Sequence, residues 1–174
     1  MTDLNRLEEI LGYQFKNKNL LLQALTHSSY ANEVYGDEAR DNERLEFLGD
    51  AVLDMVVSNI LFKSEKDKAE GVLTKLRASI VCERSLAQIS KAQGFNEFLL
   101  LGKGEEQGGG RVRDSIVADG VEAIIGAIYI DSGFTASSEF VTRLFNDAIK
   151  DAEAGKSPEL AALESKLSEI KDNV

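Results

Sequence analysis

The amino-acid sequence predicts a single all-α domain. Apolar residues recur every three or four positions along nearly the whole chain, and the alternating pattern of a half-buried strand is absent. The chain has 174 residues, of which 43% are hydrophobic and 29% charged, so one substantial core can be buried. We therefore expect helices packed on helices, with no sheet and no internal repeat.

Four elements are expected in the first half of the chain. Leucine and isoleucine at helical spacing predict a first helix at 4–11, and leucine and alanine predict a second at 20–25. Residues 30–40 are polar and are expected to form a loop. A long apolar segment then predicts a helix from 42 to about 62, buried on most of its circumference.

The second half of the chain continues the helical pattern. Apolar spacing predicts one helix over about 70–93, and Gly94 is well placed to end it. Asp114 or Ser115 can cap a later helix through a side-chain oxygen. The remaining expected elements are a glycine-rich flexible loop at 102–110, the capped helix to about Ile130 and a last helix over 141–149.

A C-terminal tail differs from the rest of the chain. The sequence SPEL at 157–160 is typical of a helix start, with serine as cap and proline in the first turn. Two roles stay open for this helix: docking on its own domain, or pairing with another chain. We predict a domain at 1–152 and a helical tail at 153–174. The apolar residues of the tail follow the spacing of a heptad seam: Leu160, Leu163, Leu167, Ile170 and Val174.

Composition limits the classes of function. A net charge of −10 argues against nucleic-acid binding unless local basic groups or divalent metal ions offset the acidic residues. A single cysteine, Cys82, and a single histidine, His27, exclude an internal disulfide and a clustered zinc site, which fits a reducing cytoplasm. No apolar run reaches the ~18 residues of a membrane helix, and the N-terminus lacks a secretory pattern. We expect a cytoplasmic protein.

The helix predicted from residue 42 carries carboxylates that a buried helix should avoid. At about 100° per residue, Glu43, Glu46 and Asp50 fall on one stripe of an otherwise apolar rod. Stacked like charges repel one another, and burying them without a cation costs several kcal/mol. We therefore expect a cationic partner at this stripe.

The helix predicted at 114–130 has the same anomaly. Asp119 and Glu122 lie on one face, among small residues that let another helix approach closely. Glycine inside a helix costs about 1 kcal/mol relative to alanine, so Gly49, Gly120 and Gly126 need a packing reason. A tight crossing of the two helices supplies one, and it would bring Glu46 and Asp50 against the second pair of carboxylates.

Four converging carboxylates without cysteine or histidine suit a hard cation such as Mg²⁺ or Mn²⁺. Such an ion can activate water and stabilise charge on a phosphoryl group. The alternative is that Arg44, Arg77 or Arg84 neutralises these acids in structural ion pairs.

At this point the sequence resembles a known family. NERLEFLGDAVL, at Asn42 to Leu53, is similar to the signature of the ribonuclease III family. LTHSSYANE precedes it, and LTKLRASIVCERSLAQIS, LGKGEEQGGG and DSIVADGVEAIIGAIYIDSG follow in the family's order, over about residues 1–150. The resemblance implies an all-α endonuclease domain that forms a symmetric homodimer and cleaves double-stranded RNA.

The resemblance also implies roles for particular residues. Glu46, Asp50, Asp119 and Glu122 match the metal-binding and catalytic carboxylates, with Mg²⁺ as cofactor and no organic cofactor. Glu43 matches a further acidic position, near the active site and the dimer interface. Phe47, an apolar residue of the helix predicted from residue 42, matches an aromatic that inserts into a pocket of the partner subunit. The products implied are 5′-phosphate and 3′-hydroxyl ends with a two-nucleotide 3′ overhang, in the processing of RNA, ribosomal RNA included.

The full-length bacterial enzymes of this family carry a basic double-stranded-RNA-binding domain after the nuclease domain. This chain stops at Val174, where that domain would begin, so we expect weaker RNA affinity. Two other functions stay open: a non-catalytic dimerisation or RNA-scaffold module, and a metal phosphohydrolase acting on small phosphates. His27 is expected to be structural. The local basic groups that could contact RNA are Lys63, Lys66, Lys68, Lys103, Arg111 and Arg113.

Overall fold

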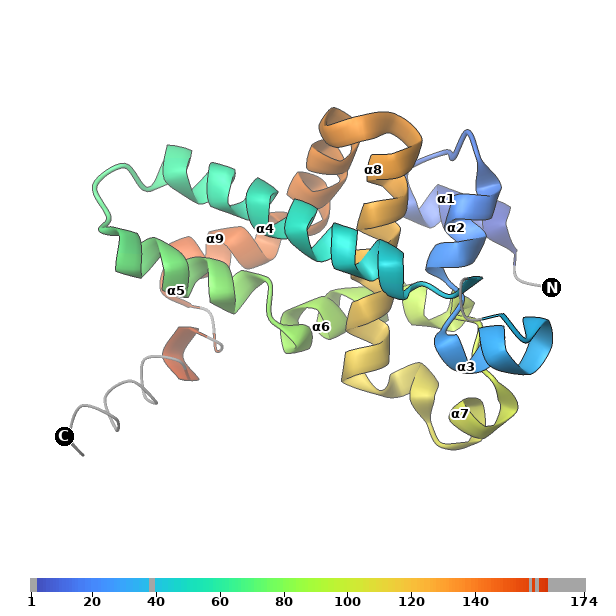
Figure 1. Cartoon of the computed structure of the whole chain (residues 1–174). Coiled ribbons are helices and arrows are strands. Elements are labelled where there is room, and N and C mark those ends of the chain that lie inside the picture. Colours follow the sequence, from blue (N-terminus) through green and yellow to red (C-terminus); the bar gives the residue numbers. More distant parts are fainter. Residues whose placement is uncertain (1–2, 38–39, 157, 159, 163–174) are drawn as a thin grey trace.

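The computed structural model describes residues 3–37, 40–156, 158 and 160–162, and these residues form an all-α fold (Figure 1). The described part of the chain contains no strand. One isolated parallel bridge joins Thr26 to Leu100. The predicted fold class is therefore confirmed. None of the helices described is long and apolar enough to cross a membrane.

The elements follow one another in short steps. The α-helices are α1 (Leu4–Leu11), α2 (Lys18–Ala24), α3 (Ser28–Tyr30), α4 (Glu43–Ser64), α5 (Glu70–Ile80), α6 (Glu83–Gln93), α7 (Lys103–Gln107), α8 (Asp114–Leu144) and α9 (Asn146–Glu153). Single turns of other helix types are η1 (Ala31–Tyr35), η3 (Phe95–Phe98) and η4 (Gly110–Val112).

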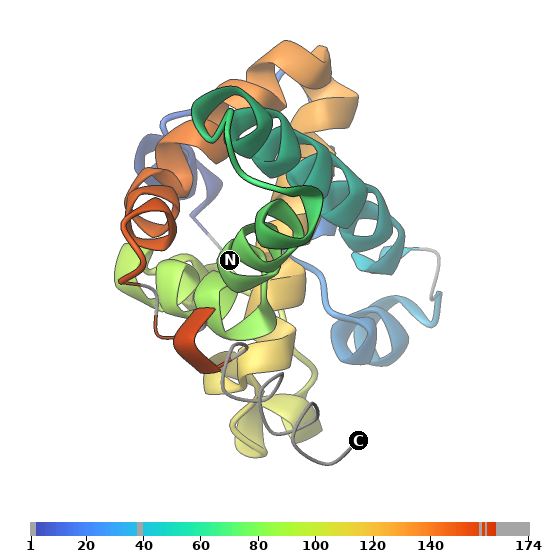
Figure 2. The same ribbon diagram turned by 90° about the vertical axis from the view of Figure 1, so that its left-hand side faces the viewer.

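Two long helices, α4 and α8, cross at the centre of the molecule and share its most extensive helix–helix contact (Figure 1). The helix α6 packs on α8, and α5 packs on α4. The helix α5 also contacts α9, and Figure 2 shows this part of the molecule from the side. The core lies between these helices and includes fully buried Leu53, Ile124 and Phe145.

The single helix predicted over 70–93 is wrong, because the chain breaks into α5 and α6 at Val81 and Cys82. Cys82 has an extended backbone, φ −70° and ψ 152°, and its Sγ contacts the carbonyl oxygen of Ser79 at 3.5 Å. The turn allows the apolar face of α5 to pack on α4 and that of α6 to pack on α8. Helical periodicity continues through the turn and therefore did not reveal it.

The helix expected to end near Ile130 continues as α8, but with a kink. Gly133 has φ 80° and ψ −174°, a backbone conformation that favours glycine, and the helix resumes in a new direction. Tyr13 anchors the kink: its hydroxyl donates to the Asp131 carboxylate at 2.6 Å and lies 2.7 Å from the Ser132 hydroxyl oxygen. The predicted helix over 141–149 therefore contains the junction between α8 and α9.

Three smaller expectations are also corrected. The segments expected to be loops, 30–40 and 102–110, contain η1 and α7 respectively. Neither Asp114 nor Ser115 caps α8: Arg113 occupies the cap position without a side-chain hydrogen bond, and Asp114 pairs with Lys91 at 2.5 Å.

Most of the predicted tail, including Leu163, Leu167, Ile170 and Val174 of the heptad seam and Ser157 of its cap, lies outside the described residues. Leu160, the first residue of the seam, is half-buried and packs against the core. The division into a domain at 1–152 and a tail at 153–174 stays a prediction.

Candidate metal centre

The close crossing of α4 and α8 depends on two glycines, Gly49 and Gly126, which carry no side chain. A Cβ atom on Gly49 would lie 1.8 Å from the carbonyl oxygen of Glu122, and one on Gly126 would lie 2.2 Å from that of Leu45. Real Cβ atoms do not approach oxygen so closely, so only glycine permits this crossing. Gly120 serves a different contact, because its Cβ would meet Leu99 at 2.9 Å.

This crossing brings carboxylates from both helices together. One oxygen each from Glu46 on α4 and from Asp119 and Glu122 on α8 lie within 4.8 Å of one another. All three side chains are half-buried. They offer a cation a small, oxygen-only set of ligands that solvent can still reach.

Asp50 and Glu43 are placed differently from these three. Both are exposed, and neither belongs to the group within 4.8 Å. Asp50 nevertheless lies close enough for its charge to raise the pKa of Glu122, and Glu43 raises that of Glu46. Three of the four carboxylates predicted to converge therefore meet in this structure, with Asp50 beside them and Glu43 at the edge.

The electrostatics of the cluster favour the binding of a cation. Burial raises the pKa of Glu46 to about 7, with the charges of Asp119, Glu43, Asp50 and Asp41 adding to the shift. Burial likewise raises the pKa of Glu122 to about 8, again with neighbouring carboxylates adding. In the described part of the chain, every charge found to act on these two pKa values is negative. Proximity of like charges and partial burial both disfavour the ionised forms.

The alternative explanation is that an arginine neutralises these acids in a structural ion pair, and the contacts of Arg77 argue against it. Its guanidinium donates to Ser58 Oγ at 3.1 Å and lies 3.7 Å from Asp54, farther along α4 from the cluster. Arg44 follows Glu43 on α4, and its side chain is exposed. Arg77 therefore does not neutralise the acid cluster.

One acidic residue of the surroundings was missed by sequence reasoning. Asp41 is buried, with 6% of its surface exposed, and its Oδ1 accepts the backbone N–H of Glu43 at 3.1 Å. Its charge adds to the raised pKa of Glu46. Its place directly before the motif was the only available signal, because its burial depends on packing against α2, where Gln23 donates to the Asp41 carbonyl at 3.1 Å.

The exposed face of α4 also corrects a prediction. The helix was expected to be buried on most of its circumference, but Phe47, Met55 and Phe62 are 81%, 60% and 74% exposed. At about 100° per residue these three lie within about 80° of one another, on an apolar stripe beside the acidic one. We refer to Phe47, Met55 and Phe62 as the α4 stripe.

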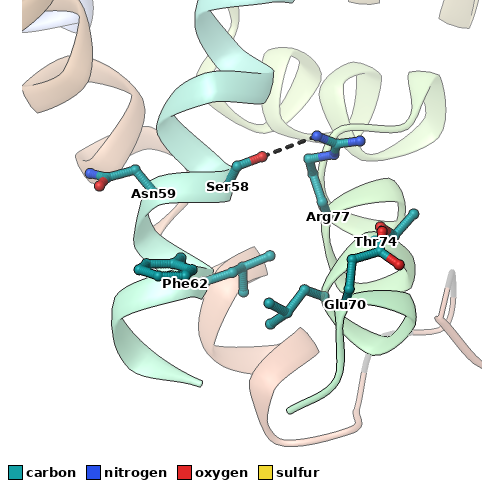
Figure 3. A pocket seen from close by; sticks show the side chains of 8 residues that line it. Ser58, Asn59, Phe62, Glu70, Thr74 and Arg77 are labelled. Carbon is teal, nitrogen blue, oxygen red and sulfur yellow. Dashed lines mark hydrogen bonds between the residues drawn. The ribbon is translucent and has the colours of Figure 1, made fainter. Parts of the chain in front are cut away.

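A groove lies at the far end of the α4 stripe, between α4 and α5 (Figure 3). Its volume is about 380 Å³. In Figure 3, Ser58 and Phe62 come from α4, Glu70 and Thr74 come from α5, and the Arg77–Ser58 hydrogen bond closes one end. Leu61 and Leu73 add apolar surface to the lining.

Most of the predicted RNA-contacting cations are engaged in local ion pairs. Lys103 lies 3.5 Å from Glu33, and Arg113 lies 2.7 Å from Glu105. Arg111 donates to the Glu106 carboxylate, which raises the pKa of Arg111, and it also donates to the carbonyl oxygens of residues 96 and 97. The pairs of Arg111 and Arg113 connect η4 and the residue after it to α7, and the pair of Lys103 connects α7 to η1. Lys63, Lys66 and Lys68 line a second pocket of about 440 Å³ with Phe62, and Lys68 pairs with Glu65 at 3.1 Å.

The fold and the acid cluster define a class of protein, an all-α domain with a carboxylate cluster at the crossing of two helices, and comparisons identify the family. A family model described as Ribonuclease-III-like matches residues 17–148. Ribonuclease 3 of Clostridium perfringens is 48% identical over 154 residues, covering 87% of this chain and 64% of that protein. Ribonuclease 3 of Listeria monocytogenes is 46% identical over 170 residues, covering 98% of this chain and 73% of that protein.

Solved structures agree with these sequence relatives. The nuclease domain of ribonuclease III from Campylobacter jejuni superposes with a TM-score of 0.78 at 44% identity, covering 84% of this chain and 98% of that one. Dicer from Pichia stipitis gives a TM-score of 0.59 at 28% identity, covering 83% of this chain and 60% of that one. The chain therefore belongs to the ribonuclease III family of endoribonucleases, and the predicted family and enzyme class are confirmed.

Proposed function

We propose that this protein is a Mg²⁺-dependent endoribonuclease that hydrolyses double-stranded RNA in the cytoplasm, with Mn²⁺ able to replace Mg²⁺. The products proposed are 5′-phosphate and 3′-hydroxyl ends, and the role is RNA processing. The observation that carries this proposal is the group of three half-buried carboxylates within 4.8 Å, two of them with pKa values raised to about 7 and 8. Such groups are typical of sites tuned for metal binding or proton transfer.

The residues present fit a divalent cation. Glu46, Asp119 and Glu122 supply carboxylate oxygens, the ligands that Mg²⁺ prefers, and exposed Asp50 lies beside them. A bound ion would supply the positive charge that polarises a phosphodiester and lowers the pKa of water. The chain's own contribution is to hold these carboxylates on two helices that the glycine contacts keep in one orientation.

Half-burial matters to this chemistry. The carboxylates are sheltered enough for charge interactions to be strong, yet they remain partly exposed to solvent. Asp50 and Glu43, which are both exposed, are proposed to act at the substrate side of the site. The metal and catalytic roles of Glu43, Glu46, Asp50, Asp119 and Glu122 are all proposals.

We further propose a symmetric homodimer formed through the α4 stripe. The Campylobacter jejuni structure is described as having flexibility in a region involved in dimer formation of its nuclease domain. Here the α4 stripe exposes three large apolar side chains, and isolated monomers rarely leave such a patch uncovered. The groove between α4 and α5 lies on the same helix as Phe47 and is proposed to receive Phe47 of the second copy.

The decisive experiment is cleavage of a duplex RNA by Asp119→Asn and Glu122→Gln in Mg²⁺. Each substitution removes a charged oxygen ligand while keeping the side-chain shape, so we expect a loss of at least 100-fold in cleavage rate. Glu139→Gln, on the exposed part of α8, is the matched control and should cleave at the wild-type rate. Wild-type cleavage by Glu122→Gln would disprove the mechanism.

The assay should be run at low salt, because the net charge of −10 and the locally paired cations both predict weak RNA binding. Low salt makes weak binding least limiting. A wild-type protein that binds duplex RNA under these conditions but does not cleave it would support the scaffold alternative instead.

A further inference from the structure

The first turn of α4 carries two acidic residues of the proposed site, Glu43 and Glu46. Glu46 supplies one of the three clustered carboxylate oxygens. The first backbone N–H groups of a helix have no acceptor within the helix, and helix ends fray unless other groups satisfy them. A ligand in a fraying turn would be poorly positioned, so the start of α4 has to be held by the rest of the chain.

The side chain that holds this turn belongs to Asp41. The residue at the N-cap position, Asn42, makes no side-chain hydrogen bond to the first turn of α4. Instead, Oδ1 of Asp41 accepts the backbone N–H of Glu43 at 3.1 Å. Aspartate and asparagine commonly make this bond in turns, to the backbone two residues farther on. It satisfies one of the unpaired N–H groups at the start of the helix.

Contacts to α2 fix the start of α4 in the fold. Gln23 Nε2 donates to the Asp41 carbonyl oxygen at 3.1 Å. Asn42 Nδ2 donates to the Ala24 carbonyl oxygen at 3.3 Å, and both Asp41 and Asn42 are buried. The Asn42 carbonyl oxygen in turn accepts the backbone N–H of Glu46 at 2.9 Å. The first turn of α4 is thus anchored on α2, while the glycine contacts at the crossing hold α4 against α8.

We propose that Asp41 is a positioning residue of the metal centre: by accepting the Glu43 N–H, it holds the first turn of α4 so that Glu46 meets the two carboxylates of α8. This inference rests on the proposed function of the acid cluster. The hydrogen bond, and not the negative charge, has this role, because Oδ1 of Asp41 contacts a backbone N–H of the turn that carries the ligand. Loss of a group that orients a metal ligand typically weakens metal binding by about 10- to 100-fold.

Two substitutions separate the hydrogen bond from the charge. Asp41→Asn keeps an acceptor oxygen at the position of Oδ1 but removes the charge. Asp41→Glu keeps the charge, but its longer side chain moves the carboxylate away from the Glu43 N–H. Asp41→Ala, which has neither group, replaces Asp41→Glu if the latter does not fold. Asp3→Ala is the matched control, because Asp3 caps α1 by accepting the Arg6 N–H at 3.1 Å.

The affinity of the full chain for Mn²⁺ is measured without RNA, by electron paramagnetic resonance, and the melting temperature is measured with EDTA. Asp41→Asn should bind Mn²⁺ within about threefold of wild type, and Asp41→Glu should bind it about 10-fold more weakly. Asp3→Ala should melt a few degrees lower than wild type, because it loses a helix cap, yet bind Mn²⁺ with wild-type affinity.

Three results would overturn the proposal. Wild-type affinity in Asp41→Glu, or in the alanine variant that replaces it, would show that the hydrogen bond does not position the ligand. Binding by Asp41→Asn as weak as that of Asp41→Glu would assign the effect to the charge. Weakened binding by Asp3→Ala would mean that Mn²⁺ affinity simply follows stability. A wild-type protein that binds no Mn²⁺ would instead refute the metal centre itself, so the two failures are distinguishable.

Discussion

Gly49 lies directly against the backbone carbonyl of Glu122, so close that a Cβ atom would stand 1.8 Å from its oxygen. The contact that brings α4 and α8 together thus involves the residue that supplies a carboxylate to the cluster. Gly126 makes the reciprocal contact with Leu45, one residue before Glu46. Stability of the fold and geometry of the site depend on the same crossing.

Gly49→Ala is expected to destabilise the protein by about 3 kcal/mol, because the added methyl group must push backbone apart from backbone. Urea denaturation measures the change. Gly71→Ala in α5 is the control, since nothing lies within 4 Å of its Cβ position, and it should be neutral or stabilising by up to about 1 kcal/mol. Equal effects of the two substitutions would contradict the close crossing.

The pH dependence of stability should reveal the cluster in metal-free protein. Glu46 and Glu122 have an ordinary pKa of 4.5, raised in the folded state to about 7 and about 8. Between pH 4.5 and these raised pKa values, the folded state holds protons that the unfolded chain has released. The free energy of unfolding therefore falls as the pH rises from about 4.5 to about 8, and their contribution is flat outside this window.

Glu122→Gln isolates this effect. The variant should lose less stability than wild type over the same pH range, by about 2 kcal/mol, which is less than the full shift would give because water screens a half-buried group. Urea titrations in EDTA at pH 5 and pH 8 measure the difference. Parallel pH profiles for the two proteins would show that the pKa of Glu122 is not raised by folding.

Phe47→Ala should weaken self-association without unfolding the chain. The side chain is 81% exposed in one copy, so its removal costs little within that copy but deletes apolar area from the proposed interface. We expect the dimer dissociation constant to rise at least 10-fold in sedimentation equilibrium. Val34→Ala, 52% exposed on η1, is the control. A dimer of wild-type strength in Phe47→Ala would count against the α4 stripe as the interface.

Deletion of residues 156–174 should leave the nuclease core folded. Leu160 packs half-buried on the core, so the loss is expected to be about 1 kcal/mol, a lowering of the melting temperature by a few degrees. Calorimetry should show one cooperative transition, and Leu160→Ala in the full chain should give a shift of similar size. Disappearance of the transition would mean that the tail is an integral part of the fold.

Much of the fold could be predicted because its signals are local. Helical spacing of apolar residues predicted the α-helical class and the long helix α4, and two glycines inside apolar helices predicted a close crossing. Gly94 ends α6 in the left-handed conformation, as its position indicated. The breaks at Cys82 and Gly133 were missed, because both lie inside continuous helical periodicity.

The sequence by itself determined that carboxylates stand at helical spacing on two apolar helices, without cysteine or a second histidine, a set that favours a hard cation. Only the tertiary structure decided that Glu46, Asp119 and Glu122 converge while Asp50 stands beside them, and that the α4 stripe is exposed. The spacing of residues along the sequence predicts which side chains share a face of one helix. Which faces meet depends on contacts between segments far apart in the chain, and those contacts exist only in the folded protein.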